Sequence, residues 1–207
     1  MKRTLAGGAA ALLMGMSAVA PAAGPSWDHA TISWILAGEV ERPGSEDDLE
    51  GYRFDFTKSL GRQFFVRAAA DTREADSAPN VDFSAHRIGI GARFPISGGR
   101  SPIELWGALN YERVVVEGSV GYGPGIDIGL RSQLTPQFDL DLAVKIFGDI
   151  DFDDFDADYT GYELTGAYKL RPDLSLLVSY GSYEVDLDGG PSIDLDGMIS
   201  VGLRLHF

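Results

Sequence analysis

The 207-residue sequence predicts an all-β fold: an up-and-down antiparallel β-barrel of about 10 strands that spans a membrane, with 8 strands as the alternative. Three observations support this prediction. Apolar and polar residues alternate with a period of two along most of the chain, as expected for strands whose two faces meet different surroundings. Tight turns alternate with longer, more acidic connections. Aromatic residues gather toward both ends of the apolar face, as they do at the two boundaries of a membrane.

Residues 1–22 have the layout of a secretory signal peptide. Lys2 and Arg3 precede an apolar run that is too short for a membrane helix, which needs about 20 residues. The run ends in Ala-Pro-Ala at 20–22, small residues that fit a cleavage site. We therefore expect an exported protein in which residues 23–207 form a single barrel domain.

The composition excludes several kinds of site and partner. The chain has no cysteine, so disulfides and thiolate metal sites are excluded. The formal net charge of -14 argues against a nucleic-acid partner, because phosphate backbones attract basic surfaces. No cofactor is expected.

Segments with the period-two pattern predict the strands. They are 30–41, 51–60, 62–74, 82–96, 103–117, 121–134, 138–151, 159–170, 174–187 and 195–207. The tight connections are 60–61, 97–102, 135–136 and 171–173, and the longer or more acidic ones are 42–50, 75–80, 118–120, 153–158 and 188–193. Membrane β-barrels place short turns in the periplasm and longer loops outside, so an even number of strands leaves both termini on the short-turn side.

The aromatic residues distinguish this pattern from a soluble lipocalin-like barrel, whose apolar face points inward. Two aromatic rings that bracket an aliphatic band are the girdles of a membrane barrel. The expected girdle residues are Tyr52, Phe56, Phe64, Phe94, Tyr111, Tyr122, Phe138, Tyr162 and Tyr168.

The opposite face mixes both charge signs with glycine and alanine, which predicts a narrow polar lumen. The candidate lumen charges are Arg67, Arg87, Arg93, Glu112, Asp127, Arg131, Asp141, Lys145, Glu163, Lys169 and Arg204. We assign Asp149 to the same face and His206 to its periplasmic rim. Opposite charges on neighbouring strands attract, so this balance of signs favours a lumen plugged by ion pairs over a pore lined by one sign.

The last residues, Ser200-x-Gly202-x-x-Leu205-x-Phe207, resemble the C-terminal assembly signal of bacterial outer-membrane β-barrels. We expect Phe207 to face lipid and the last strand to close the barrel against the first, since hydrocarbon cannot satisfy free strand edges. The wider pattern resembles, in architecture only, the small barrels of the outer membrane protein A and X type. This resemblance implies the outer membrane of a Gram-negative bacterium, contact with the lipid bilayer and lipopolysaccharide, and periplasmic chaperones and the barrel assembly machinery as partners during biogenesis.

One group of residues has the types needed for hydrolysis. Ser84 and His86 share a face, which the phase of Ile88 makes the lipid face, and Glu74 is expected diagonally near Ser84. The group resembles that of outer-membrane lipid A deacylases, although that family has His before Ser. The alternative is amphipathic residues at headgroup level, and we predict that the protein is not an enzyme. An omptin-type protease is disfavoured because no histidine is expected in the lumen near the outer rim.

The acidic segments 148–159 and 185–197 are candidate sites for divalent cations, which bind several carboxylate oxygens. The alternative is solvated outer loops. For the whole protein two functions lead: a barrel with a charge-paired lumen and a structural or surface-interaction role, and a small porin-like diffusion pore. A lipid-facing hydrolase is the third hypothesis.

Overall fold

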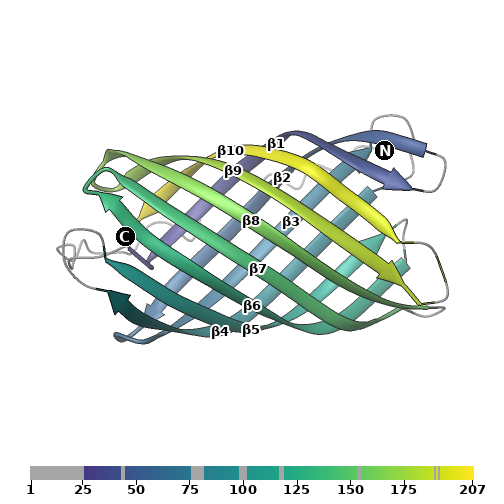
Figure 1. Cartoon of the computed structure of the whole chain (residues 1–207), viewed down its shortest axis with the longest axis horizontal. Helices are drawn as coiled ribbons and strands as arrows, with labels where there is room; N and C mark the ends of the chain where they lie inside the picture. Colours follow the sequence, from purple (N-terminus) through teal and green to yellow (C-terminus); the bar gives the residue numbers. More distant parts are fainter. Residues whose placement is uncertain are drawn as a thin grey trace, which may run out of the picture.

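The structure, a computed structural model, describes residues 26–42, 45–75, 82–97, 102–116, 119–152, 155–188, 190 and 192–207. These residues form ten strands that close into an antiparallel barrel (Figure 1). The strands are β1 (His29–Arg42), β2 (Ser45–Leu60), β3 (Phe64–Ala75), β4 (Asp82–Ser97), β5 (Ile103–Val116), β6 (Ser119–Thr135), β7 (Phe138–Asp151), β8 (Asp156–Arg171), β9 (Leu174–Leu187) and β10 (Ile193–His206). The predicted all-β barrel is confirmed, and the eight-strand alternative is wrong.

Each strand pairs with its neighbours in sequence, and β1 pairs with β10 to complete the ring. The closing ladder runs from His29 opposite His206 to Glu41 opposite Asp194. Closure pairs the backbone groups of both outermost strands, which hydrocarbon would otherwise leave unsatisfied. In the described part of the chain, no helix is long and apolar enough to cross a membrane.

The two ends of the barrel differ. The C-terminus and the last residues of β2, β4, β6 and β8 lie at one end, at the left in Figure 1. We call it the tight-turn end, and the opposite end the loop end. The signal peptide predicted over 1–22 and most of the connections at 75–80 and 97–102 lie outside the described residues.

Several strands extend further toward the loop end than the sequence pattern predicts. β2 begins at Ser45 and β8 at Asp156, within segments expected to be acidic connections. Acidic residues are uncommon in strands, but here they project into water while the backbone still pairs, as Glu39 does with Asp48. The strand ladder therefore continues through residues that composition alone assigns to loops.

The predicted facing of Asp149 is wrong. Its φ of 52° is unusual for a residue other than glycine, and the pairing of β7 with β8 shifts between Phe147 and Ile150. The irregularity turns Asp149 outward, where it is exposed, and turns Ile150 inward, where it is buried. Period-two phasing cannot anticipate such an extra residue.

The outer face of the barrel is apolar along the middle of its strands. Ile88 and Leu109 are 65% and 64% exposed. Other large apolar side chains exposed on this face include Ile32, Ile90, Ile126, Ile128, Leu142, Val144, Leu164 and Val178. A soluble protein seldom exposes so large a continuous apolar surface, whereas a transmembrane barrel requires such a band. A lipocalin-like barrel has its apolar face on the inside, so this apolar exterior does not fit that alternative.

Candidate functional site

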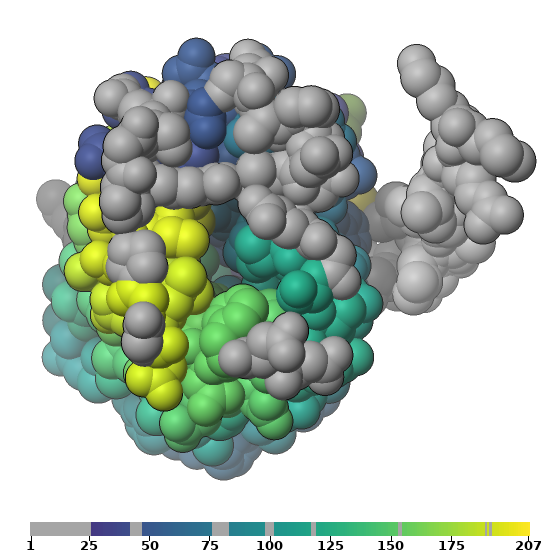
Figure 2. All heavy atoms as spheres, turned by 90° about the vertical axis from the view of Figure 1, so that its right-hand side faces the viewer, coloured from purple at the N-terminus to yellow at the C-terminus, as the bar shows by residue number. Residues whose placement is uncertain are grey.

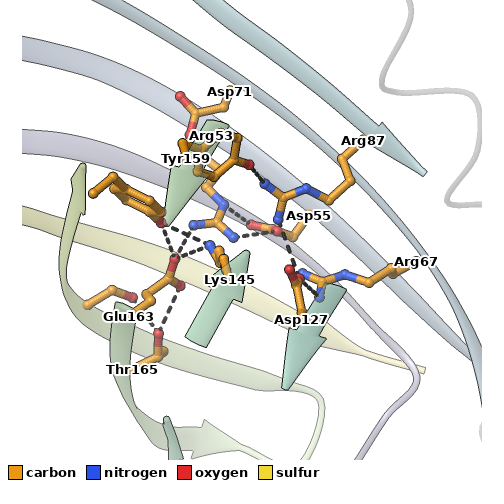
Figure 3. Close-up of polar contacts among 12 residues, drawn as sticks. Arg53, Asp55, Arg67, Asp71, Arg87, Asp127, Lys145, Tyr159, Glu163 and Thr165 are labelled. Atoms are coloured by element: carbon orange, nitrogen blue, oxygen red, sulfur yellow. Dashed lines mark hydrogen bonds and ion pairs between the residues drawn. The ribbon is translucent and has the colours of Figure 1, made fainter. Parts of the chain in front are cut away.

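Charged residues fill the middle of the lumen in a set of contacts that we call the ion-pair layer (Figure 3). Its first group surrounds Glu163 of β8. Arg53 Nη1 lies 2.5 Å from Glu163 Oε2, and Lys145 Nζ lies 2.7 Å from the same oxygen. Tyr183 accepts a 2.9 Å hydrogen bond from Lys145 and donates one of 3.1 Å to Glu163. Arg53 also pairs with Asp55 at 2.8 Å.

The second group surrounds Asp127, whose side chain is fully buried. Arg67 Nη1 lies 2.5 Å from Asp127 Oδ2, and Arg87 Nη1 lies 3.5 Å from it. Arg87 also pairs with Glu112 at 3.0 Å and donates a 2.7 Å hydrogen bond to the Tyr159 hydroxyl. Tyr159 in turn donates to Glu112.

A third pair, Arg73 with Asp71 at 2.7 Å, completes the layer. The layer then contains five cations and five carboxylates, so its formal charge is zero. Its charged members are Arg53, Asp55, Arg67, Asp71, Arg73, Arg87, Glu112, Asp127, Lys145 and Glu163.

These contacts join walls that are far apart around the ring. The pair of Arg53 and Glu163 connects β2 to β8, with β1, β10 and β9 between them. The hydrogen bond from Arg87 to Tyr159 connects β4 to β8, with three strands between them. The layer therefore crosses the lumen instead of coating one wall.

Nearer the tight-turn end, three aromatic rings form a second layer, which we call the aromatic plug: Trp27, Phe65 and Trp106. The ring centroids of Trp27 and Phe65 are 4.5 Å apart, and Trp27 and Trp106 pack edge-on at 6.0 Å. Trp27 Nε1 donates a 2.6 Å hydrogen bond to Glu104. Sequence reasoning missed Trp27, because it precedes the first strand and belongs to no alternating pattern.

Two glycines make room for the plug. A Cβ built on Gly91 would lie 2.2 Å from the Phe65 ring, and one on Gly129 would lie 2.4 Å from Trp106. No side chain fits at such distances. Gly91 and Gly129 are therefore places where neighbouring rings lie against the wall of the lumen.

The remaining candidate lumen charges surround the plug and the tight-turn end. Arg93 and Arg131 lie over the Trp27 ring, at 5.5 and 5.1 Å from its centroid. Arg131 approaches Asp141 at 3.9 Å, which is longer than a hydrogen bond. Arg204 Nε donates to Thr31 at 3.2 Å.

At the rim of this end, Lys169 pairs with Asp139 at 3.4 Å. His206 Nε2 and Ser175 Oγ share a hydrogen bond of 2.9 Å. Among the described residues no carboxylate lies within ion-pair or hydrogen-bond distance of His206, so the pair lacks the acid that orients a catalytic histidine.

At the loop end the lumen becomes apolar and encloses a cavity of about 300 Å³, which we call the vestibule. Figure 2 looks onto this end and shows a hollow near its centre, beside the yellow residues of β10. The wall residues that enclose it include Val40, Leu49, Val114, Ile150, Phe152 and Leu195. Arg73 with Asp71 and Arg87 with Glu112, from the ion-pair layer, contribute to the same lining.

Polarity is thus reversed along the strands. In β10, Ile193 and Leu195 line the vestibule while Asp196 is exposed; in β8, Ala157 lines it while Asp158 is exposed. At these strand ends the outer face of the barrel is in contact with water, which favours acidic side chains on the outside and leaves the apolar side chains on the inside. Sequence reasoning missed the vestibule, because its signal was present only in part. Ala157 is in phase with the lumen charge Glu163, but Leu195 has the phase of the lipid face and turns inward through the register shift between Leu195 and Met198.

The expected girdle residues all point outward. Seven of them are exposed, and Phe56 and Phe138 are half-buried. Tyr111 and Tyr122 stack at 6.4 Å on neighbouring strands. From the C-terminal motif, Phe207 stacks at 5.9 Å on Phe56 and Gly202 lies against Ser33 of β1. Whether this motif directs assembly remains a prediction.

The group considered for hydrolysis faces outward and stays apart. Ser84 is the backbone partner of Thr72, so Glu74 is diagonal to it, and His86 is exposed. Among the described residues, no hydrogen bond connects Ser84, His86 and Glu74. In the same residues, no three His, Asp or Glu side chains are arranged to hold a metal ion. Asp153 and Asp154, from the acidic segment proposed for cations, lie outside the described residues.

No protein-family model and no curated protein matches the chain. Its structural likeness is to outer-membrane barrels. Neisserial surface protein A is 15% identical with a TM-score of 0.46, over 86% of this chain and 96% of that one. The outer membrane protease OmpT from Escherichia coli is 13% identical with a TM-score of 0.48, over 86% and 96%. An outer membrane channel from Pseudomonas putida is 10% identical with a TM-score of 0.48, over 88% and 96%. No substrate or role follows from these likenesses.

Proposed function

We propose that this chain is an integral outer-membrane protein of a Gram-negative bacterium, with a lumen sealed by ion pairs and a structural or surface-interaction role. The apolar exterior supports contact with the bilayer and lipopolysaccharide. The observation that carries the proposal is the neutral ion-pair layer, because it connects opposite walls of the lumen. Nothing in the proposal requires an enzymatic activity.

The alternative is a small diffusion pore. A conducting pore needs a continuous column of water, and an ion crossing this lumen would have to separate buried charges from their partners. Separating one partner from a buried pair is costly, since the remaining charge has neither water nor a counterion. The aromatic plug lies beyond this layer as a second barrier. Both layers favour a sealed barrel over a pore.

Conductance in planar bilayers tests the proposal. We expect negligible steady conductance for the wild-type protein. Lys145, which is 3% exposed, contacts the same Glu163 oxygen as Arg53, so Lys145→Met is expected to lower stability and raise conductance. Lys58→Met is the matched control, since it removes the same charge from an outward position. Lys58 pairs with Asp28 at 3.2 Å, but this pair is partly exposed, and such pairs contribute only about 0–1 kcal/mol, so stability should change little and conductance should stay negligible.

The opposite result would support the pore. In that case the wild-type conductance would be large, and Lys145→Met would leave stability unchanged while shifting ion selectivity toward cations. Such a result would overturn the sealed lumen and leave the membrane barrel itself intact.

A further inference from the structure

We infer that the vestibule is a binding site for a small, uncharged, apolar molecule, of about the size of a two-ring aromatic, that arrives from the water outside the membrane. The inference goes beyond the sealed barrel, which requires no ligand. It rests on the size of the cavity, on the charge balance of its floor and on the surroundings of its outer wall.

The size of the cavity sets the size of the ligand. Its volume of about 300 Å³ lies at the lower end of the range for small-molecule pockets. An apolar cavity of about 150 Å³ already stays dry and binds benzene, so this one accommodates a molecule about twice as large. The walls suit such a molecule, since Val114 and Leu195 contribute aliphatic surface and Phe152 contributes an aromatic ring.

The ion pairs at the floor of the vestibule disfavour a charged ligand. Arg73 and Asp71 satisfy one another with hydrogen bonds of 2.8 and 2.7 Å, and Arg87 is shared between Glu112 and Tyr159. The Arg73 guanidinium also lies over the rings of Phe83 and Tyr183, at 5.0 and 5.4 Å. A charged ligand would have to compete for groups that already have partners, whereas an uncharged one leaves every pair intact.

The outer wall indicates where the ligand comes from. Opposite the vestibule residues, the outward positions of the same strands carry exposed acids, among them Asp48, Asp158 and Glu184. Lipid chains therefore end below this part of the barrel, and a membrane acyl chain would have to leave the bilayer to reach the cavity. The ion-pair layer closes the floor, so the vestibule is a binding pocket and not an entrance to a channel.

Methyl NMR on the full chain in lipid nanodiscs tests this inference with naphthalene as the probe. We expect saturable shifts of the Val114, Ile150 and Leu195 methyl groups. The lipid-facing methyl groups of Ile126 and Val144 should show only the gradual, unsaturated change of a probe dissolving in the bilayer. Naphthoate, which has the same rings and a carboxylate, should bind more weakly than naphthalene.

Two variants and a control link the shifts to the cavity. Ala157→Phe places a ring in the vestibule and should weaken binding by about tenfold or more, since hydrophobic pockets discriminate to that degree over a single methylene. Thr160→Phe adds the same ring at an exposed position on the same strand and should leave affinity unchanged. Val114→Thr keeps the volume, adds a hydroxyl and should also weaken binding, so the test does not depend on one variant folding.

Three results would overturn the inference. Shifts confined to the lipid-facing methyl groups would show that naphthalene only dissolves in the bilayer. Contacts between lipid acyl protons and Leu195, without added probe, would make a lipid chain the occupant. An affinity that is the same in Ala157→Phe and Thr160→Phe, with both barrels folded, would place the probe outside the vestibule.

Discussion

Asp127→Asn is expected to lower the free energy of unfolding by about 3–5 kcal/mol, the usual cost of removing one partner from a buried ion pair. The Asp127 side chain is fully buried and contacts Arg67 at 2.5 Å and Arg87 at 3.5 Å. Asparagine keeps its shape but removes the charge. Arg87 retains Glu112, whereas Arg67 is left without a carboxylate partner in the part of the chain that the structure describes. Urea unfolding in phospholipid vesicles measures the change.

Asp173→Asn is the control for this prediction. Asp173 pairs with Arg171 at 3.2 Å, but their side chains are 54% and 64% exposed. Exposed pairs of this kind contribute about 0–1 kcal/mol, so the control should change little. If Asp127→Asn costs no more than Asp173→Asn, water solvates the middle of the lumen, and the sealed barrel is wrong.

The membrane-spanning part of each strand could be predicted from the sequence because a strand has a fixed period and two unlike surroundings. Val144 and Lys145 are adjacent, and the alternation alone places the first outside and the second inside. The same argument fails at Asp149, where an irregularity resets the phase. It also fails at Ser45 and Asp156, because composition reports exposure to water and not whether the backbone is paired.

The contacts between side chains inside the lumen were harder to predict than the face on which each side chain lies. Asp127 and Lys145 are backbone partners on neighbouring strands and carry opposite charges. Asp127 nevertheless pairs with Arg67 of β3, with β4 and β5 between them, whereas Lys145 pairs with Glu163 on the neighbouring strand β8. Partners across the lumen depend on its width and on how far side chains reach, and neither is encoded in local periodicity. The aromatic plug is missed for the same reason.

The vestibule shows that one strand can obey two patterns in succession. The inward positions of β8 carry Glu163 and Thr165 where lipid lies outside, then Tyr159 and Ala157 where water lies outside. A prediction that assumes one environment along the whole strand begins the strand at Tyr159 and assigns Ala157 to a loop. The inward phase continues unbroken, so the reversal of polarity marks the height at which the bilayer ends.

Val144→Arg is expected to cost about 2–4 kcal/mol of unfolding free energy, the range for arginine at the bilayer midplane on the lipid face of a barrel. Val144 is 45% exposed on the outer face and lies between Ile128 of β6 and Tyr162 of β8. Its outward position gives an arginine no luminal acid to pair with. Ala143→Ser, on the adjacent inward position, should cost far less. Ala143 belongs to the same buried cluster as the aromatic plug, but polar groups such as Asp141 and Thr165 line the same cavity and suit a hydroxyl.

Thr160→Arg tests whether the cost of Val144→Arg comes from the membrane or from a general intolerance of charge on the outer face. Thr160 also faces outward and is exposed, but it lies beside the exposed Asp158, toward the loop end of β8. Near the interface the same arginine should cost only about 0–1 kcal/mol, since the penalty on the lipid face depends on depth. Equal costs for Val144→Arg and Thr160→Arg in vesicles would contradict a hydrocarbon boundary between them. A steep difference would locate that boundary below the vestibule, where the outward residues change from apolar to acidic.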